Sequence, residues 1–410
     1  MRTTTRAALL AASASSALVL AGCAEGAPAP SGGGPVDLSD GLQIVTTTTQ
    51  VHDFVANLAE GLEEAGATVE ITPLLGPGES AHSFEPTAAD LTAMAAADLV
   101  VESGMGLESW LDDAVASSGF AGTRVDASAG FDPESLHEGH DHGGDLATAN
   151  PSAPESMAPI ESQDAHDAES ADEHAGHDHG DEAAAEDAHA SEPADAHATE
   201  SADEHAGHDH GDDGHDHGDG PNPHLWSAPA GAEVMVENIA AALEAADPAH
   251  ADVVRDSADA YLGKLDALTE WITQNVDTVP EAERTVVTNH DALEYLNEQF
   301  HITQVGTIIP SWDDAAEPSA ADIDELIANM KANGVTAIFT ETQLSPATAE
   351  TIAAQTGAKV YSGLDALYTD SLGAEGTPEA TYIGAQIHNI ELLMESWGHT
   401  ASAAPAELTA

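Results

Sequence analysis

The sequence predicts an α/β protein with two parallel-sheet lobes joined by a long rigid helix. In both halves of the chain, short β-branched runs alternate with apolar residues at helical spacing, which favours parallel strands connected by crossover helices. The length of 410 residues suits more than one core. A His- and acid-rich stretch interrupts the first half, and we expect it to form a disordered loop.

The N-terminal lobe is expected at 40–131 and, after the interruption, at 221–246. Runs with strand composition alternate there with helical patterns, each bounded by turn residues. The expected strands are 41–49, 67–75, 98–103 and 123–128, and the expected helices are 51–66, 87–97, 107–118 and 233–246.

The long linking helix is expected within 247–279. Asp247 and Pro248 have the residue types of an N-cap and of a first helical position, and Pro280 lies just beyond the pattern. About 28 helical residues would form a rod of about 42 Å, which is long enough to cross a whole lobe. The apolar stripe steps by four and three residues and consists of Val254, Ala258, Tyr261, Leu265, Leu268 and Ile272.

The C-terminal lobe is expected at 280–400, followed by a tail at 401–410. The same alternation returns, so parallel strands are expected again. The expected strands are 284–290, 301–309, 335–341 and 358–363, and the expected helices are 291–300, 321–334, 345–357 and 381–398. Ligands of open α/β sheets bind at the carboxyl ends of strands, so a site would draw on loops from both lobes.

The segment 132–220 differs sharply in composition from the rest of the chain. It contains 27 acidic residues and 14 histidines, and no Lys or Arg lies between Arg124 and Arg255. Apolar residues larger than Ala are almost absent, so little in the segment could offset the entropy lost on ordering. Its imidazole clusters could gather zinc weakly near a tighter site; the alternative is an insert that only promotes solubility.

The N-terminus carries the features of a lipoprotein signal. Residues 1–23 combine two arginines, a short apolar run and the sequence LAGC, in which Cys23 is the expected lipidation site; 24–39 is the expected flexible tether. Cys23 is the only cysteine, so neither an intrachain disulfide nor a cysteine zinc site can form. We therefore expect an extracytoplasmic protein that is held at the outer face of the cell membrane.

The charge balance favours cations as partners. The chain has 74 acidic residues against 8 Lys and Arg, for a formal charge of −66. Nucleic acid is a poor partner for such a surface, because phosphate binding depends on Lys and Arg. With no Cys available, metal chemistry must come from His, Asp and Glu.

Four loop positions are the candidate metal ligands. His82 lies in a Gly- and Pro-rich loop after a strand, and His224 lies in the Pro-framed turn PNPHLW. His290 ends a strand, and Asp370 lies in a Gly-rich loop before the last helix. Three imidazoles and one carboxylate would complete a tetrahedral zinc site. Asp365 is an alternative to Asp370, because it follows the preceding strand directly.

These motifs resemble those of the metal-binding receptors of zinc and manganese ABC importers, a family that includes zinc-uptake and treponemal-type receptors. His82 precedes an aromatic residue and EPT, and His224 stands in an NPH motif followed by Trp. In the family, a His or Glu follows the first strand of the C-terminal lobe, as His290 does, and an Asp precedes a TY helix start, as Asp370 does. The resemblance extends from about residue 40 to about residue 400 and implies that Glu341 supports a ligand.

The chain also departs from the family pattern. Residues 226–229 read WSAP where the family usually has LDP, so the resemblance supplies no Asp to orient His224. The manganese members tend to carry Glu at the third position, so His290 favours zinc as the cargo.

The resemblance implies a monomeric receptor without catalytic residues that captures Zn²⁺ outside the cytoplasm and delivers it to an ABC permease. Binding needs neutral imidazoles, so it should weaken as the pH falls through about 6 to 5. Three alternatives remain open: a manganese (Mn²⁺) receptor of the same family, a passive metal buffer, and an extracellular zinc hydrolase. The hydrolase would use the three histidines as ligands and Glu341 as its base.

Overall fold

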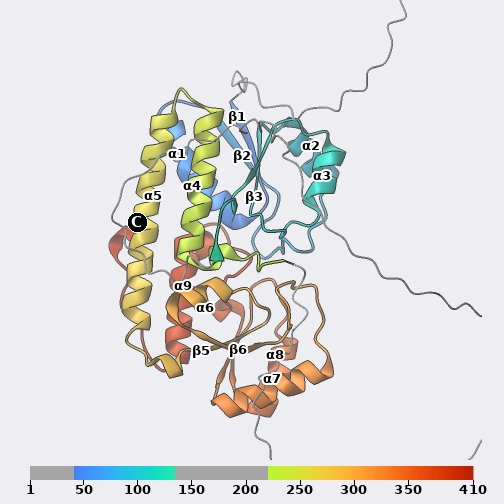
Figure 1. Cartoon of the computed structure of the whole chain (residues 1–410), viewed down its shortest axis with the longest axis vertical. Helices are drawn as coiled ribbons and strands as arrows, with labels where there is room; N and C mark the ends of the chain where they lie inside the picture. Colours follow the sequence, from blue (N-terminus) through green and yellow to red (C-terminus); the bar gives the residue numbers. More distant parts are fainter. Residues whose placement is uncertain (1–40, 134–219, 410) are drawn as a thin grey trace, which may run out of the picture. The chain divides into compact units, whose positions relative to one another are not determined.

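The computed structural model describes residues 41–133 and 220–409, which belong to one compact unit of the chain (Figure 1). The predicted signal peptide with Cys23, the tether and almost all of the His-rich segment lie outside the described residues.

The first half of the chain forms a four-stranded parallel sheet. Strand β1 (Leu42–Thr46) pairs with β2 (Val69–Pro73) on one side and with β3 (Leu99–Glu102) on the other, and β4 (Thr123–Asp126) pairs with β3. β3 is buried along its whole length, as expected for a parallel strand covered on both faces. The prediction of parallel strands in this half is confirmed.

Helices lie on both sides of this sheet (Figure 1). On one side, α1 and α4 pack against each other and against α5; on the other side, α2 and α3 pack together. The bounds are α1 Thr49–Glu64, α2 Ala88–Ala96, α3 Leu111–Ser118, α4 Pro229–Ala246 and α5 Ala251–Val276. A short 3-10 turn, η3 (Leu225–Ser227), precedes α4.

The second half of the chain contains two parallel strand pairs. β5 (Thr285–Thr288) pairs with β6 (Thr303–Thr307), and β7 (Ala337–Phe339) pairs with β8 (Lys359–Tyr361). β5 and β7 also lie in contact, so the two pairs are neighbours. The helices of this half are α6 Glu294–Phe300, α7 Ala320–Asn333, α8 Ala347–Thr356 and α9 Tyr382–Ser396. The α/β class with parallel strands is therefore confirmed.

The start of α5 differs from the prediction. Asp247 is not its N-cap: the helix begins at Ala251, and Asp247 instead ends α4, where its backbone N–H donates to Leu243 O. The Asp247 carboxylate accepts from the backbone N–H of Ala249 and lies 2.6 Å from His250 Nδ1. The carboxylate thus stabilises the turn between the two helices, and Pro248 belongs to this turn.

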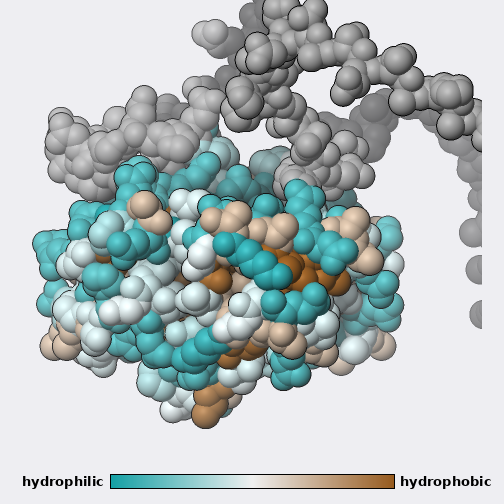
Figure 2. Space-filling view, turned by 90° about the horizontal axis from the view of Figure 1, so that it is seen from below, coloured by the Kyte–Doolittle hydropathy of each residue, from teal (hydrophilic) through white to brown (hydrophobic). Residues whose placement is uncertain are grey.

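Helix α5 contacts elements from both halves of the chain. It packs along α1 and α4 and also touches α6 and α9. Its predicted apolar stripe is buried, and these residues join the larger of two hydrophobic cores. The smaller core lies in the second half, around Val287, Met330, Ile338 and Ile352. The face shown in Figure 2 is largely hydrophilic, and its apolar residues form small separated areas.

Candidate metal centre

The four candidate ligands come from four chain segments and lie close together. His82 lies in the loop between β2 and α2, and His224 directly precedes η3. His290 follows β5, and Asp370 lies in the connection between β8 and α9. One donor atom from each of the four residues lies within 4.8 Å of every other.

The donor atoms are spaced as a tetrahedral ion requires. His224 Nε2 lies 3.1 Å from His82 Nε2 and 3.4 Å from His290 Nε2. Asp370 Oδ1 lies 3.1 Å from His224 Nε2, and Asp370 Oδ2 lies 3.2 Å from His290 Nε2 and 3.7 Å from His82 Nε2. Zinc bonds of 2.0–2.1 Å in a tetrahedron place the ligand atoms about 3.3 Å apart. The observed distances bracket this separation.

The cluster is closed off from solvent. The four side chains are at most 2% exposed, and the Trp312 ring lies beside His82 with the ring centroids 5.9 Å apart. Asp370 Oδ1 accepts no hydrogen bond from any described residue. A buried carboxylate oxygen in this state is costly, and coordination of a cation would stabilise it.

Asn222 orients His224. The family pattern would give this role to an Asp, but residues 226–229 of this chain contain none. The Asn222 amide nitrogen donates to Asp291 O, and its Oδ1 accepts from the backbone N–H of His224 at 3.0 Å. Because the carbonyl can only accept and the N–H can only donate, the orientation of the amide is fixed. Asn222 Oδ1 also lies 2.7 Å from His224 Nδ1, so Nδ1 carries the proton and Nε2 presents its lone pair to the cluster.

Glu341 supports His290 through Nδ1, whereas Nε2 is the ring nitrogen that belongs to the cluster. Glu341 Oε2 lies 2.5 Å from His290 Nδ1, and both side chains are fully buried. Glu341 Oε1 accepts from the backbone N–H groups of Asn289 and His290, and Oε2 accepts from the Thr369 hydroxyl. A carboxylate in this position fixes the ring and increases the basicity of Nε2.

The segment that carries Asp370 is anchored to distant parts of the chain. Gln50 in α1 and the Trp226 indole both donate to Thr369 O at 2.8 Å, and the backbone N–H of Leu372 donates to Thr49 Oγ1. Gln343 donates to Asp370 Oδ2 at 3.0 Å. These contacts hold the carboxylate in place from three separate segments: the start of α1, the turn at Trp226 and the loop at Gln343.

Burial and neighbouring charges shift the pKa values of the cluster residues in different directions. Burial lowers the pKa of His82 to about 4, so this ring is neutral at pH 7. Burial also opposes the charged form of His290, but the carboxylates of Glu341 and Asp370 outweigh it and hold the pKa of His290 well above its usual value. Burial alone would raise the pKa of Asp370, but the charged His290 ring beside it outweighs burial and holds that pKa well below its usual value. Without metal, His290 therefore carries a proton beside an ionised Asp370 at neutral pH.

The structure separates the two candidate carboxylates. Asp365 lies in the 3-10 turn η5 (Gly363–Asp365) and is exposed, whereas Asp370 is 2% exposed within the cluster. The sequence alone did not indicate that Asn222, Gln343 or Gln50 would contact the cluster or the segment that carries Asp370. The Pro-framed PNPH motif was the only available signal for Asn222, because an Asn two residues before a turn residue commonly caps its N–H.

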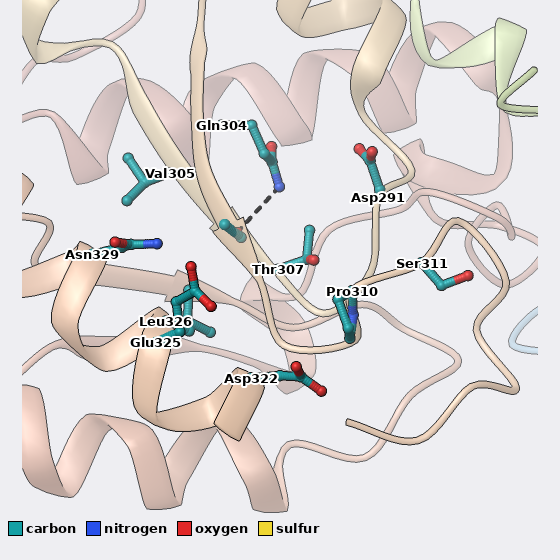
Figure 3. A pocket seen from close by; sticks show the side chains of 11 residues that line it. Asp291, Gln304, Val305, Thr307, Pro310, Ser311, Asp322, Glu325, Leu326 and Asn329 are labelled. Carbon is teal, nitrogen blue, oxygen red and sulfur yellow. Dashed lines mark hydrogen bonds between the residues drawn. The ribbon is translucent and has the colours of Figure 1, made fainter. Parts of the chain in front are cut away.

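The cavity in Figure 3 is distinct from this cluster. It has a volume of about 260 Å³, lies between β6 and α7, and contains none of the four candidate ligands. Asp291, Asp322 and Glu325 contribute carboxylates to its lining.

In the part of the chain that the structure describes, no helix has both the length and the apolar character of a membrane span.

The fold and the buried cluster define a metal-binding protein with donors for a four-coordinate ion. The chain matches the family described as zinc-uptake complex component A, periplasmic, over residues 44–396. It therefore belongs to this family, whose members are substrate-binding receptors for metal uptake. The prediction of a receptor rather than an enzyme is confirmed, and the hydrolase alternative falls away.

The relatives that the chain resembles are named for different metals. The iron-binding protein YfeA of Yersinia pestis is 25% identical, with 89% of each chain covered. The manganese-binding lipoprotein MntA of Bacillus subtilis is 24% identical over 87% of this chain and 89% of its own. The high-affinity zinc uptake system protein ZnuA of Brucella abortus is 32% identical, over 37% of this chain and 42% of its own.

Solved structures share the fold. The periplasmic zinc-binding protein TroA from Treponema pallidum is 20% identical, with a TM-score of 0.59 over 86% of this chain and 98% of its own. The manganese-bound periplasmic metal-binding protein from Candidatus Liberibacter asiaticus has the same identity and TM-score, over 87% of this chain and 99% of its own.

Proposed function

We propose that the protein captures Zn²⁺ through His82, His224, His290 and Asp370. The observation that carries the proposal is the set of four buried donors at tetrahedral spacing, with a carboxylate oxygen that accepts no hydrogen bond from the described residues. Three imidazoles with one carboxylate form a donor set that suits zinc. With all four positions supplied by protein, the ion is held as cargo and no site is left for a reacting water.

Manganese is the second candidate, because relatives that align along most of the chain are named for manganese or iron. The donor set favours zinc over manganese, which prefers oxygen ligands and higher coordination numbers. Competition between the two ions for the purified protein distinguishes the candidates.

The receptor passes its cargo to an ABC permease and acts outside the cytoplasm. The family assignment and relatives named as lipoproteins support this placement. Cys23 is the proposed lipid attachment site, and the protein acts as a monomer. Helix α5 is the proposed rigid link between two lobes, because it contacts elements from both halves of the chain. The His-rich segment 132–220 gathers zinc at weak sites and raises its concentration near the tight one.

Paired aspartate substitutions test the proposed ligands. Asp370→Ala removes the buried carboxylate, whereas Asp365→Ala removes an exposed one five positions earlier. We expect wild type and Asp365→Ala to bind one zinc tightly in the presence of a competing chelator. Asp370→Ala should bind at least about 100-fold more weakly, because one of four ligands is lost. Equal affinities for the two variants would remove Asp370 from the site.

Deletion of 137–219 tests the proposed role of the His-rich segment. Zinc titration by calorimetry should retain the single tight event and lose several weak ones. Loss of the tight event would contradict the proposal that the tight site is separate from the weak sites of the His-rich segment. A wild-type protein without weak binding events would contradict it as well.

A further inference from the structure

We propose that Asn222 is a positioning residue that fixes His224 relative to His290 and thereby favours Zn²⁺ over Mn²⁺. The inference rests on the proposed function and deepens it, because it assigns selectivity to a residue that does not touch the metal. Asn222 is 5% exposed.

The Asn222 side chain joins two ligand-bearing turns. Its Oδ1 accepts from the turn that carries His224, and its Nδ2 donates at 2.7 Å to the carbonyl of Asp291, the residue after His290. The Asn222 carbonyl in turn accepts a 2.6 Å hydrogen bond from the buried Tyr295 hydroxyl. One residue thus uses its acceptor, its donor and its backbone to connect segments that are far apart in the sequence.

This connection bears on the distance between the ligand atoms of His224 and His290. His224 Nε2 and His290 Nε2 are 3.4 Å apart, close to the separation of about 3.3 Å in a tetrahedral zinc site. The carbonyl of His290 is also held, since it accepts from the Thr288 hydroxyl at 2.7 Å. With His290 fixed from its own strand and from Glu341, Asn222 is the contact that places His224 against it.

Rigid placement of two imidazoles discriminates between ions. Zinc gains from four ligands at short, tetrahedral distances, whereas manganese prefers longer bonds, more oxygen and higher coordination numbers. If His224 could tilt or retreat, zinc would lose a well-placed ligand, while manganese could replace it with water at little cost. Loss of the Asn222 amide should therefore weaken zinc binding more than manganese binding.

A purely structural role for Asn222 predicts a different result. If the substitution only populated a partly unfolded, non-binding form, the apparent affinity for every metal would fall by the same factor. The ratio of zinc affinity to manganese affinity would then stay unchanged. This ratio is therefore the deciding measurement.

The test uses Asn222→Ala and Asn222→Ser, both of which remove the side-chain amide that donates to Asp291 O. The control is Asn275→Ala, which removes a comparably buried amide, 4% exposed, that donates to Trp271 O and accepts from the backbone N–H of Ser402. Zinc affinity is measured against a competing chelator, and manganese affinity by direct titration of the full chain.

For both Asn222 variants we expect zinc affinity to fall about 10- to 100-fold and manganese affinity by less than about threefold. Asn275→Ala should lower the melting temperature and keep the wild-type ratio. An unchanged ratio in the Asn222 variants would overturn the inference, as would an equal fall in Asn275→Ala. If Asn222→Ala does not fold, the ratio for Asn222→Ser decides alone. A wild-type protein without a tight zinc site would instead contradict the proposed function.

Discussion

Replacing Glu341 by Gln removes the negative charge beside His290 and keeps the size of the side chain. The carboxylate lies 2.5 Å from His290 Nδ1, so the variant loses the contact that makes this ring a strong ligand. The amide group of Gln would also direct an N–H group at the N–H of the ring. We expect a 10- to 100-fold loss of zinc affinity at pH 8, equivalent to about 1.4–2.7 kcal/mol.

The same substitution changes how zinc binding depends on pH. In the wild type the carboxylates of Glu341 and Asp370 outweigh burial and raise the pKa of His290 well above its usual value. Below that pKa, zinc must displace a proton, so the apparent affinity falls about tenfold per pH unit from this group alone. This moves the expected weakening to a higher pH than the window of about 6 to 5 that unperturbed histidines predict. In Glu341→Gln the decline should begin at a lower pH.

The assay is zinc titration against a competing chelator at pH 8, 7 and 6. Glu325→Gln is the control, because Glu325 is an exposed carboxylate of the same half of the chain. The affinities of wild type and Glu341→Gln should converge as the pH falls, while Glu325→Gln should follow the wild type. Parallel curves for wild type and Glu341→Gln would refute the coupling between Glu341 and His290.

Two further predictions concern stability. Burial raises the pKa of Asp53 to about 6. The stabilising effect of its protonated carboxyl is therefore complete below the unfolded value of 3.8 and is lost as the pH rises through 6. In urea unfolding, Asp53→Asn should remove a loss of stability of about 2 kcal/mol between pH 4 and pH 7. An Ala side chain at Gly231 would overlap the carbonyl oxygen of Leu225, so Gly231→Ala should destabilise the protein by about 1–3 kcal/mol. Gly263→Ala in α5, with open space around it, should instead raise the melting temperature, and the same sign for both variants would contradict the packing argument.

The sequence predicted the elements well because each depends on local periodicity. The stripe of α5 is visible in its own residues, and the alternation of strands and helices indicates parallel pairing. The boundary at Asp247 was wrong because an Asp–Pro pair is compatible with both a helix start and a turn before it. Local sequence alone does not distinguish the two.

The site was predictable only to the level of its candidate ligands. His82, His224, His290 and Asp370 stand in recognisable loop motifs, so their proximity could be anticipated, although Asp365 remained a competitor. The contacts that orient them could not, because they join distant segments: Gln50 reaches Thr369 across 319 positions. Such pairings follow from how the elements pack, and no periodicity within a segment encodes them.

The most direct test of the account is a crystal structure of the protein grown with zinc, with the ion located by anomalous scattering. We expect one strong peak about 2.0–2.2 Å from His82 Nε2, His224 Nε2, His290 Nε2 and a carboxylate oxygen of Asp370. A peak elsewhere among the described residues, or an ion with water in place of the carboxylate, would contradict the assignment of these four side chains as the zinc site.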